Sequence, residues 1–188
     1  YCSPGQHLGD HSNMKVNGVE NSGGSLGHGL GIAAGMALSA KLMKKDYITY
    51  VLTGDGECQE GSIWESALFI GNKKLNNLFW IIDYNGLQAN SRICDTNGLE
   101  PFADKLRAFG FLVKTVDGHN HSDLYEVLKA DRAHLPEKPT AVIAKTIKGY
   151  GVPLLEDQDG WHGKTPNTEE YAQIVRELGM TMEEFMQL

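Results

Sequence analysis

The sequence has few cysteines, no long apolar segment and no excess of positive charge, and each shortage excludes a class of protein. Three of its 188 residues are cysteines (Cys2, Cys58 and Cys94), and none forms a C-x-x-C pair, so neither a disulfide framework nor a zinc site is predicted. No segment approaches the ~18 consecutive apolar residues of a membrane-spanning helix. The 17 basic and 24 acidic residues leave a net charge of −7, which disfavours nucleic acids and anionic membranes as partners. We therefore expect a reduced, cytoplasmic protein.

The rest of the composition is that of an ordinary globular protein, and the pattern along the chain predicts alternating strands and helices. Hydrophobic residues make up 41% and charged residues 22% of the sequence, which argues against global disorder. Strands are predicted at 47–52, 77–83, 111–116 and 140–147. Helices are predicted at 25–45, 59–73, 101–109, 121–135 and 168–178, with one or two further helical turns in 181–188.

This alternation is typical of an α/β fold with a mainly parallel sheet and helices on both faces. In such folds ligands bind outside the carboxyl ends of the strands, so the residues that follow each strand are the first candidates for function. Residues 148–166 form a long Gly/Pro/Asp-rich loop after the last predicted strand, suited to a lid or a binding loop. Ser122 or Asp123 is expected to cap the helix at 121–135, and Gly179 to end the helix at 168–178.

Two turns that follow neighbouring predicted strands contain the most informative polar residues. The first turn is Gly54-Asp55-Gly56-Glu57, and the second is Asp83-Tyr84-Asn85-Gly86. The residues between them are enough for one helix and one strand, and a right-handed crossover places the carboxyl ends of two parallel strands on the same edge. Either turn alone would be ordinary, but together they predict that Asp55 and Asn85 converge on one ligand.

The chemistry of these two side chains indicates a magnesium ion bound to a phosphate group. One or two protein oxygens completed by phosphate oxygens are the usual ligands of Mg²⁺. A carboxylate about 4 Å from a phosphate charge repels it by roughly 4 kcal/mol at an effective dielectric constant near 20. A helix N-terminus contributes only about 0.3–1 kcal/mol in the other direction. A phosphate next to Asp55 therefore needs a divalent cation between the two groups.

The sequence resembles the transketolase family of thiamine-diphosphate enzymes, and the resemblance covers nearly the whole chain. The segment GDGECQEGSIWESALFIGNKKLNNLFWIIDYNG at 54–86 is similar to the thiamine-diphosphate signature. The runs GSLGHG at 24–29, KTIKGYGV at 145–152 and Trp161-His162-Gly163 match the family in the same order. The resemblance is strongest to the amino-terminal subunits of split bacterial transketolases, in which the diphosphate-binding and pyrimidine-binding domains lie on separate chains.

The resemblance implies a set of site residues and two ligands, thiamine diphosphate and Mg²⁺. Asp55, Asn85 and the backbone carbonyl of Leu87 would be the metal ligands. The residues implied to contact the cofactor are Gly24, Ser25 and Leu26 at its rings, and Gly54, Gly56, Glu57 and His162 near its diphosphate. His162 and His7 are the implied catalytic histidines, with His7 matching a family histidine that follows a Pro-Gly pair.

The resemblance also implies how the chain functions and what it lacks. Residues 1–166 would be the thiamine-diphosphate-binding domain, without its first strand and helix, and 167–188 a helical tail. With a separate pyrimidine-binding subunit, in a heterotetramer, the chain would transfer a two-carbon ketol unit from a ketose to an aldose, both often phosphorylated. Two alternatives stay open: a subunit of another thiamine enzyme, such as a 2-oxo acid dehydrogenase α-subunit or a 1-deoxyxylulose-5-phosphate synthase, and a non-catalytic binding subunit.

Three smaller features have mainly structural interpretations. Gly27, Gly31 and Gly35 recur every four residues, which favours close packing on a neighbouring helix over a subunit interface. His119, after a predicted strand, is expected to be a loop or capping residue rather than a catalytic one. Cys58 lies near the first turn, but no base is apparent that would make it a nucleophile.

Overall fold

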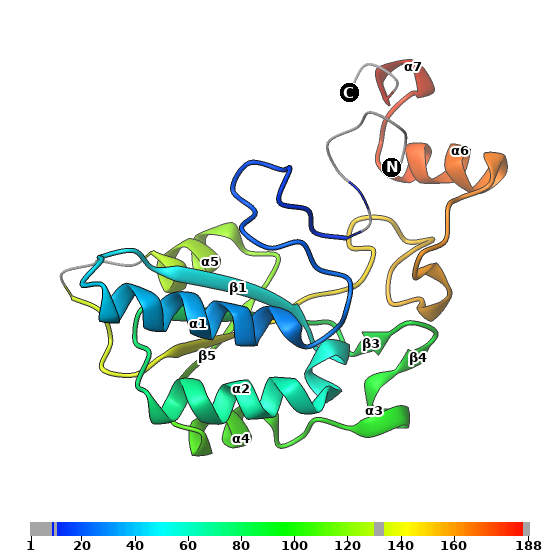
Figure 1. Cartoon of the computed structure of the whole chain (residues 1–188). Coiled ribbons are helices and arrows are strands. Elements are labelled where there is room, and N and C mark those ends of the chain that lie inside the picture. The colour runs from blue at the N-terminus through cyan, green and yellow to red at the C-terminus, as the bar shows by residue number, and fades with distance from the viewer. Residues whose placement is uncertain (1–8, 10, 130–133, 186–188) are drawn as a thin grey trace.

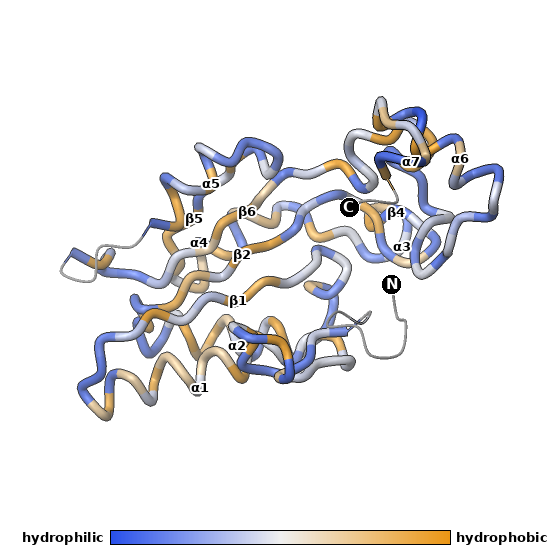
Figure 2. Tube along the Cα trace, turned by 90° about the horizontal axis from the view of Figure 1, so that it is seen from above, coloured by the Kyte–Doolittle hydropathy of each residue, from blue (hydrophilic) through white to orange (hydrophobic). Residues whose placement is uncertain are grey.

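The computed structural model of the chain describes residues 9, 11–129 and 134–185. Its main sheet has four strands, and all three strand pairs are parallel. The strands lie in the order β1-β2-β6-β5, as Figure 2 shows. Their bounds are β1 (Thr49–Gly54), β2 (Leu78–Tyr84), β5 (Leu112–Asp117) and β6 (Thr140–Lys145). The predicted α/β class with a mainly parallel sheet is confirmed.

Helices cover both faces of this sheet. On one face lie α1 (His28–Leu42) and α2 (Gly61–Asn72), and α5 (His121–Leu128) lies on the other, as the two views together show (Figures 1 and 2). The short helix α4 (Phe102–Ala108) packs beside α2. In the part of the chain that is described, no helix has the length and apolar character needed to cross a membrane.

The core lies between the sheet and the helices α1, α2 and α4. Trp80 at the centre of β2 is fully buried, and its indole N–H donates to the Thr53 hydroxyl at 2.8 Å. The same ring packs edge-to-face against Phe111, with ring centres 5.7 Å apart. Strand β6 is buried on both faces along five of its six residues, as expected for an inner strand of a parallel sheet.

Small residues bring α1 close to α2, which accounts for two of the three regularly spaced glycines. A Cβ at Gly27 would overlap the Ser62 hydroxyl, and one at Gly31 would lie 3.2 Å from the Ser66 hydroxyl, both on α2. A Cβ at Gly35 would meet nothing within 4 Å. The packing interpretation therefore holds for Gly27 and Gly31, whereas Gly35 faces open space.

The region between β2 and α4 contains elements that the sequence pattern does not predict. A two-stranded antiparallel hairpin, β3 (Leu87–Gln88) and β4 (Ser91–Arg92), is followed by the short helix α3 (Ile93–Asn97). Strands of two residues are too short to show a period in the sequence, which is why this hairpin is missed.

The predicted cap of α5 was wrong by two or three residues. Asn120 caps the helix, because its side-chain oxygen accepts from the backbone N–H groups of Ser122 at 3.0 Å and Asp123 at 3.2 Å. The helix also ends at Leu128, earlier than the expected residue 135. Asn is as good a cap as Ser or Asp, so composition alone could not choose among neighbouring candidates.

The C-terminal helices lie beyond the carboxyl ends of the strands (Figure 1). They are α6 (Thr168–Glu177) and α7 (Met182–Phe185). Asn167 and Glu170 form a capping box at the start of α6, and Gly179 with φ +72° follows its end as expected. A domain boundary at residue 166 stays a prediction.

Gly71 provides a test of the packing between α2 and the end of α4. A Cβ at Gly71 would overlap the backbone carbonyl oxygen of Phe109, so Gly71→Ala is expected to lower the free energy of unfolding by about 1–3 kcal/mol. Gly35→Ala is the matched control inside α1, expected to raise it by about 0.5–1 kcal/mol. Urea unfolding measures both, and a Gly71→Ala protein as stable as the parent would contradict this packing.

Candidate functional site

The two polar turns predicted to converge do meet at the carboxyl edge of the sheet. Strands β1 and β2 are neighbours, with Gly54 paired to Asp83 at their ends. The Asp55 side chain is 1% exposed, and its Oδ2 accepts from the backbone N–H of Gly86 at 2.6 Å. Its Oδ1 accepts from the N–H of Gly56 at 2.8 Å. Asp55 therefore contacts the turn that contains Asn85.

Asn85 is oriented by its own turn and by the neighbouring strand end. Its Oδ1 accepts from the backbone N–H of Leu87 at 2.9 Å, and its Nδ2 donates to Asp83 Oδ2 at 3.4 Å. The hydroxyl of Thr146, just after β6, donates to the other oxygen of Asp83. Three adjacent strands thus supply groups to one site. Sequence reasoning missed Asp83 and Thr146 as orienting residues, although Asp83 ends a predicted strand and Thr146 lies near the end of another.

The charges of this site favour a cation. Burial raises the pKa of Asp55; the backbone N–H groups of Gly86 and Gly56 oppose that rise, and the negative charge of Asp83 adds to it. None of the ion pairs found within the described residues includes Asp55. A buried carboxylate with a second carboxylate nearby and no basic partner is costly unless a cation compensates it. The residues present therefore fit a divalent ion.

The oxygen groups of the site are of the kind that suits Mg²⁺. They comprise a carboxylate at Asp55 and an amide oxygen at Asn85, both of them hard ligands. Within the described residues, no group of three or more His, Cys, Asp or Glu side chains is placed to hold a metal.

Glu57 ties the segment before α1 to the same edge of the sheet. Its carboxylate accepts from the backbone N–H of Gly27 at 2.8 Å and from that of Gly54 at 3.3 Å. The Ser62 hydroxyl donates to the carbonyl of Gly27 at 3.2 Å. These bonds place the exposed segment 24–26 beside the first polar turn. Both carboxylate oxygens of Glu57 bind backbone amides, so its role in this structure is to join two loops.

Gly56 lets the first polar turn approach the β3–β4 hairpin. A Cβ at Gly56 would lie 2.8 Å from the Cβ of Gln88, closer than real side chains come. The short helix Gly56–Gln59 begins here, and the Asp55 side chain accepts from its first N–H. Any larger residue at position 56 would push the turn away from the hairpin and displace Asp55.

Of the two predicted catalytic histidines, only His162 lies in the described part of the chain. His162 is exposed and follows the short helix Asp159–Trp161, in the long loop after β6. No hydrogen bond seen among the described residues joins His162 to either polar turn. His7 lies outside the described residues. Both assignments stay predictions.

Comparison with known proteins identifies the family. Residues 5–187 match the family model described as the thiamine diphosphate binding domain of transketolase. The chain belongs to the transketolase family. This agrees with the resemblance noted in the sequence and with the site at the carboxyl ends of β1 and β2.

Individual transketolases and their component chains match over most of this chain. One component of the apulose-4-phosphate transketolase of Phocaeicola vulgatus is 40% identical over 179 residues, which are 95% of this chain and 63% of that protein. A 6-deoxy-6-sulfo-D-fructose transketolase subunit of Clostridium sp. is 37% identical, over 93% of this chain and 64% of that protein. The chain thus spans just under two thirds of the length of these relatives.

A solved transketolase has the same arrangement of elements. The enzyme from Campylobacter jejuni superposes with a TM-score of 0.78 and 30% sequence identity. The superposition covers 87% of this chain and 26% of that chain. This transketolase-family chain therefore has the fold of one part of a much longer enzyme.

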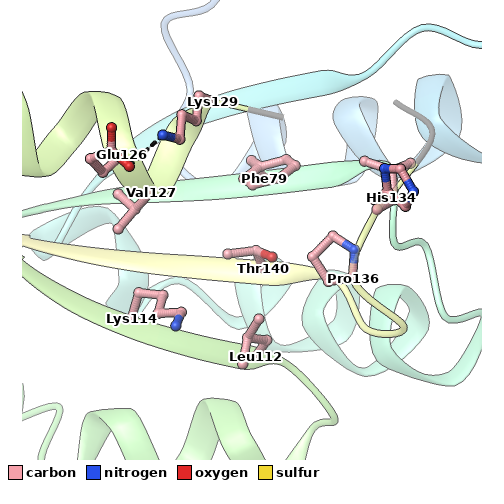
Figure 3. Close-up of a pocket in the computed structure, with 10 residues that line it drawn as sticks. Phe79, Leu112, Lys114, Glu126, Val127, Lys129, His134, Pro136 and Thr140 are labelled. Carbon is pink, nitrogen blue, oxygen red and sulfur yellow. Dashed lines mark ion pairs between the residues drawn. The ribbon is translucent and has the colours of Figure 1, made fainter. Parts of the chain in front are cut away.

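A cavity at the opposite edge of the sheet is not the candidate site of this transketolase-family chain. It has a volume of about 290 Å³ and is lined by Phe79, Leu112 and Thr140 at the amino ends of their strands (Figure 3). Glu126 and Lys129 beside it form an ion pair. Ligands of parallel α/β sheets bind at the carboxyl ends, so the polar groups around Asp55 locate the site better than this cavity does.

His119 and Cys58 have the structural roles expected of them. His119 Nε2 accepts from the backbone N–H of Ile147 at 2.8 Å, and its ring stacks on Tyr150 with centres 3.8 Å apart. Cys58 is fully buried and donates to the carbonyl of Gly54 at 3.2 Å. Burial raises the pKa of Cys58 to about 12, which makes it a poor nucleophile.

The burial of Cys58 can be tested by comparing its alkylation with that of Cys94. At pH 8 the raised pKa leaves about one Cys58 in 10⁴ as thiolate, whereas Cys94 is exposed. Iodoacetamide is expected to modify Cys94 in the folded protein and Cys58 only after unfolding, as followed by peptide mass spectrometry. Equal labelling rates of the two in the folded protein would contradict the burial of Cys58.

Proposed function

We propose that this chain binds thiamine diphosphate through Mg²⁺ at the Asp55–Asn85 site and is the diphosphate-binding component of a transketolase-like enzyme. With a pyrimidine-binding partner chain, it would transfer a two-carbon ketol unit from a ketose to an aldose, both often phosphorylated. The single observation that supports this most is the Gly86 N–H bond to the buried Asp55 carboxylate, because it joins the two turns of the thiamine-diphosphate signature.

The chain's own residues would hold and orient the cofactor. Asp55, Asn85 and the carbonyl of Leu87 would bind Mg²⁺, and the exposed segment 24–26 would lie along the cofactor rings. Gly54 and Gly56 would let the diphosphate approach the backbone of the first turn. Glu57 would contribute by keeping segment 24–27 beside this turn, since it accepts from the amides of Gly27 and Gly54. When bound, the cofactor supplies the covalent chemistry of ketol transfer.

Two histidines are the proposed contacts to the substrate. His162, on the exposed loop after β6, and His7 would bind substrate oxygens or transfer protons to and from them. Because His162 is exposed and distant in sequence from the polar turns, its approach to the cofactor depends on the position of its loop.

A partner chain is proposed because two relatives of this chain are themselves named as transketolase subunits. Helices α1 and α2 expose apolar side chains at Ile32, Leu68 and Phe69, which a pyrimidine-binding partner could cover. We propose a cytoplasmic heterotetramer acting on sugars or sugar phosphates. The relatives are transketolases, which favours ketol transfer over the use of 2-oxo acids and over a non-catalytic role.

Cofactor binding tests the metal site. Asp55→Asn is expected to weaken the binding of Mg–thiamine diphosphate by about two to three powers of ten, because a unit charge about 4 Å away contributes roughly 4 kcal/mol. Asp104→Asn removes an exposed carboxylate on α4 and is expected to leave affinity unchanged. Calorimetric titration with the partner chain present measures both. Equal affinity of Asp55→Asn and the parent would exclude Asp55 as a metal ligand.

Reconstitution tests the requirement for a partner. The 188-residue chain alone is expected to show no ketol transfer, because the separate pyrimidine-binding domain is expected on the partner. Addition of a pyrimidine-binding chain, sought as the product of a neighbouring reading frame, is expected to restore transfer from ketose donors. Activity of the chain alone, or preference of the pair for 2-oxo acids, would contradict the proposal.

A further inference from the structure

The β3–β4 hairpin lies between the second polar turn, Asp83–Gly86, which we call the metal turn, and the loop that contains His162. On one side, Gly56 packs so closely on Gln88 of β3 that no Cβ fits. Leu87 follows Asn85 after one residue, and it is paired with Arg92 across the two-stranded ladder. The hairpin is therefore continuous with the proposed Mg²⁺ site, and Arg92 lies on its second strand, β4.

On its other side the hairpin contacts the loop after β6 through one ion pair. The Arg92 guanidinium donates to both carboxylate oxygens of Asp157, at 2.8 Å and 3.3 Å. This bidentate geometry fixes orientation as well as distance. The Arg92 bond also lowers the pKa of Asp157. Both side chains are about half exposed, at 50% and 55%.

Asp157 is the point at which the chain leaves a compact loop toward His162. Its backbone N–H donates to the carbonyl of Lys148 at 3.0 Å, which closes the loop 148–157. Gly149 packs against Leu155 and the Gly151 N–H donates to Glu156 at 2.8 Å, so the loop is well ordered inside. Asp157 has φ +53°, and this left-handed turn directs the chain into Asp159–Trp161 and then His162.

We propose that Arg92 is a positioning residue, whose bidentate pair with Asp157 holds the His162 loop against the hairpin of the metal turn. The path from Asn85 through Leu87, Arg92 and Asp157 to His162 consists of covalent bonds, one ladder pair and one ion pair. A ligand that restricts the motion of the metal turn would thereby also restrict the motion of the loop that contains His162. The significance of the pair for catalysis, though not its existence, rests on the function proposed above.

Amide hydrogen exchange of the full-length protein without cofactor tests the pair directly. Arg92→Gln and Asp157→Asn are each expected to speed exchange in the peptide 148–163 about two- to fivefold, the range that an exposed ion pair produces. Asn tolerates the left-handed conformation of position 157, so this variant removes the charge without straining the backbone. Arg107→Gln, which breaks a similarly exposed pair with Asp104 on α4, is the control and leaves 148–163 unchanged.

Two further measurements separate a specific pair from general loosening. The double variant is expected to exchange no faster than either single variant. Arg92→Lys keeps the positive charge but loses the bidentate geometry, and it is expected to restore part of the protection that Arg92→Gln loses. Additive effects, or no effect in 148–163, would overturn the proposal.

Mg–thiamine diphosphate tests the coupling. Cofactor binding is expected to slow amide exchange in 148–163 of the parent, and to slow it by a factor at least twofold smaller in Arg92→Gln. Equal slowing in the two proteins would refute the coupling. Failure of the parent to bind the cofactor with the partner chain present would overturn the proposed function instead, because exchange without cofactor still decides the role of the pair.

Discussion

The hydrogen bond from the Gly86 amide to the buried Asp55 carboxylate is the interaction on which the site depends. It joins the turns after β1 and β2 and places an anion where water is excluded. Two amide bonds do not offset the loss of hydration, since the pKa of Asp55 remains raised by burial. The fold thus holds a charge that the described residues do not neutralise, and a bound cation would offset it.

The neighbouring loops are arranged around this bond by backbone contacts rather than by large side chains. Glu57 joins the segment before α1 to the first turn, and Gly56 allows the hairpin to approach from the other side. Glycine is required at position 56 because a Cβ there would lie too close to the Cβ of Gln88. A site assembled from close backbone approaches leaves segment 24–26 exposed beside the first polar turn.

Sequence reasoning succeeded where a residue's position follows from the period of regular structure. Asp55 and Asn85 directly follow adjacent parallel strands joined by one crossover, so the convergence of their turns follows from topology. Sequence reasoning failed where contacts between short or irregular segments determine the local structure. The two-residue strands of the hairpin show no period, and Asn120 rather than Ser122 or Asp123 is the cap because it lies one residue before the helix. The bonds of Glu57 to Gly27 and Gly54 could not be foreseen, because they span loops without regular geometry.

The sequence by itself determined the parallel sheet, the edge at which the two polar turns meet and the oxygen groups available there, because strand and helix periods and turn residues are local properties. Only the tertiary structure decided that Asp55 is buried without a basic partner among the described residues, that Asp83 and Thr146 orient Asn85, and that Arg92 meets Asp157. These properties arise from contacts between residues distant along the chain, and solvent exclusion exists only once those residues have packed together.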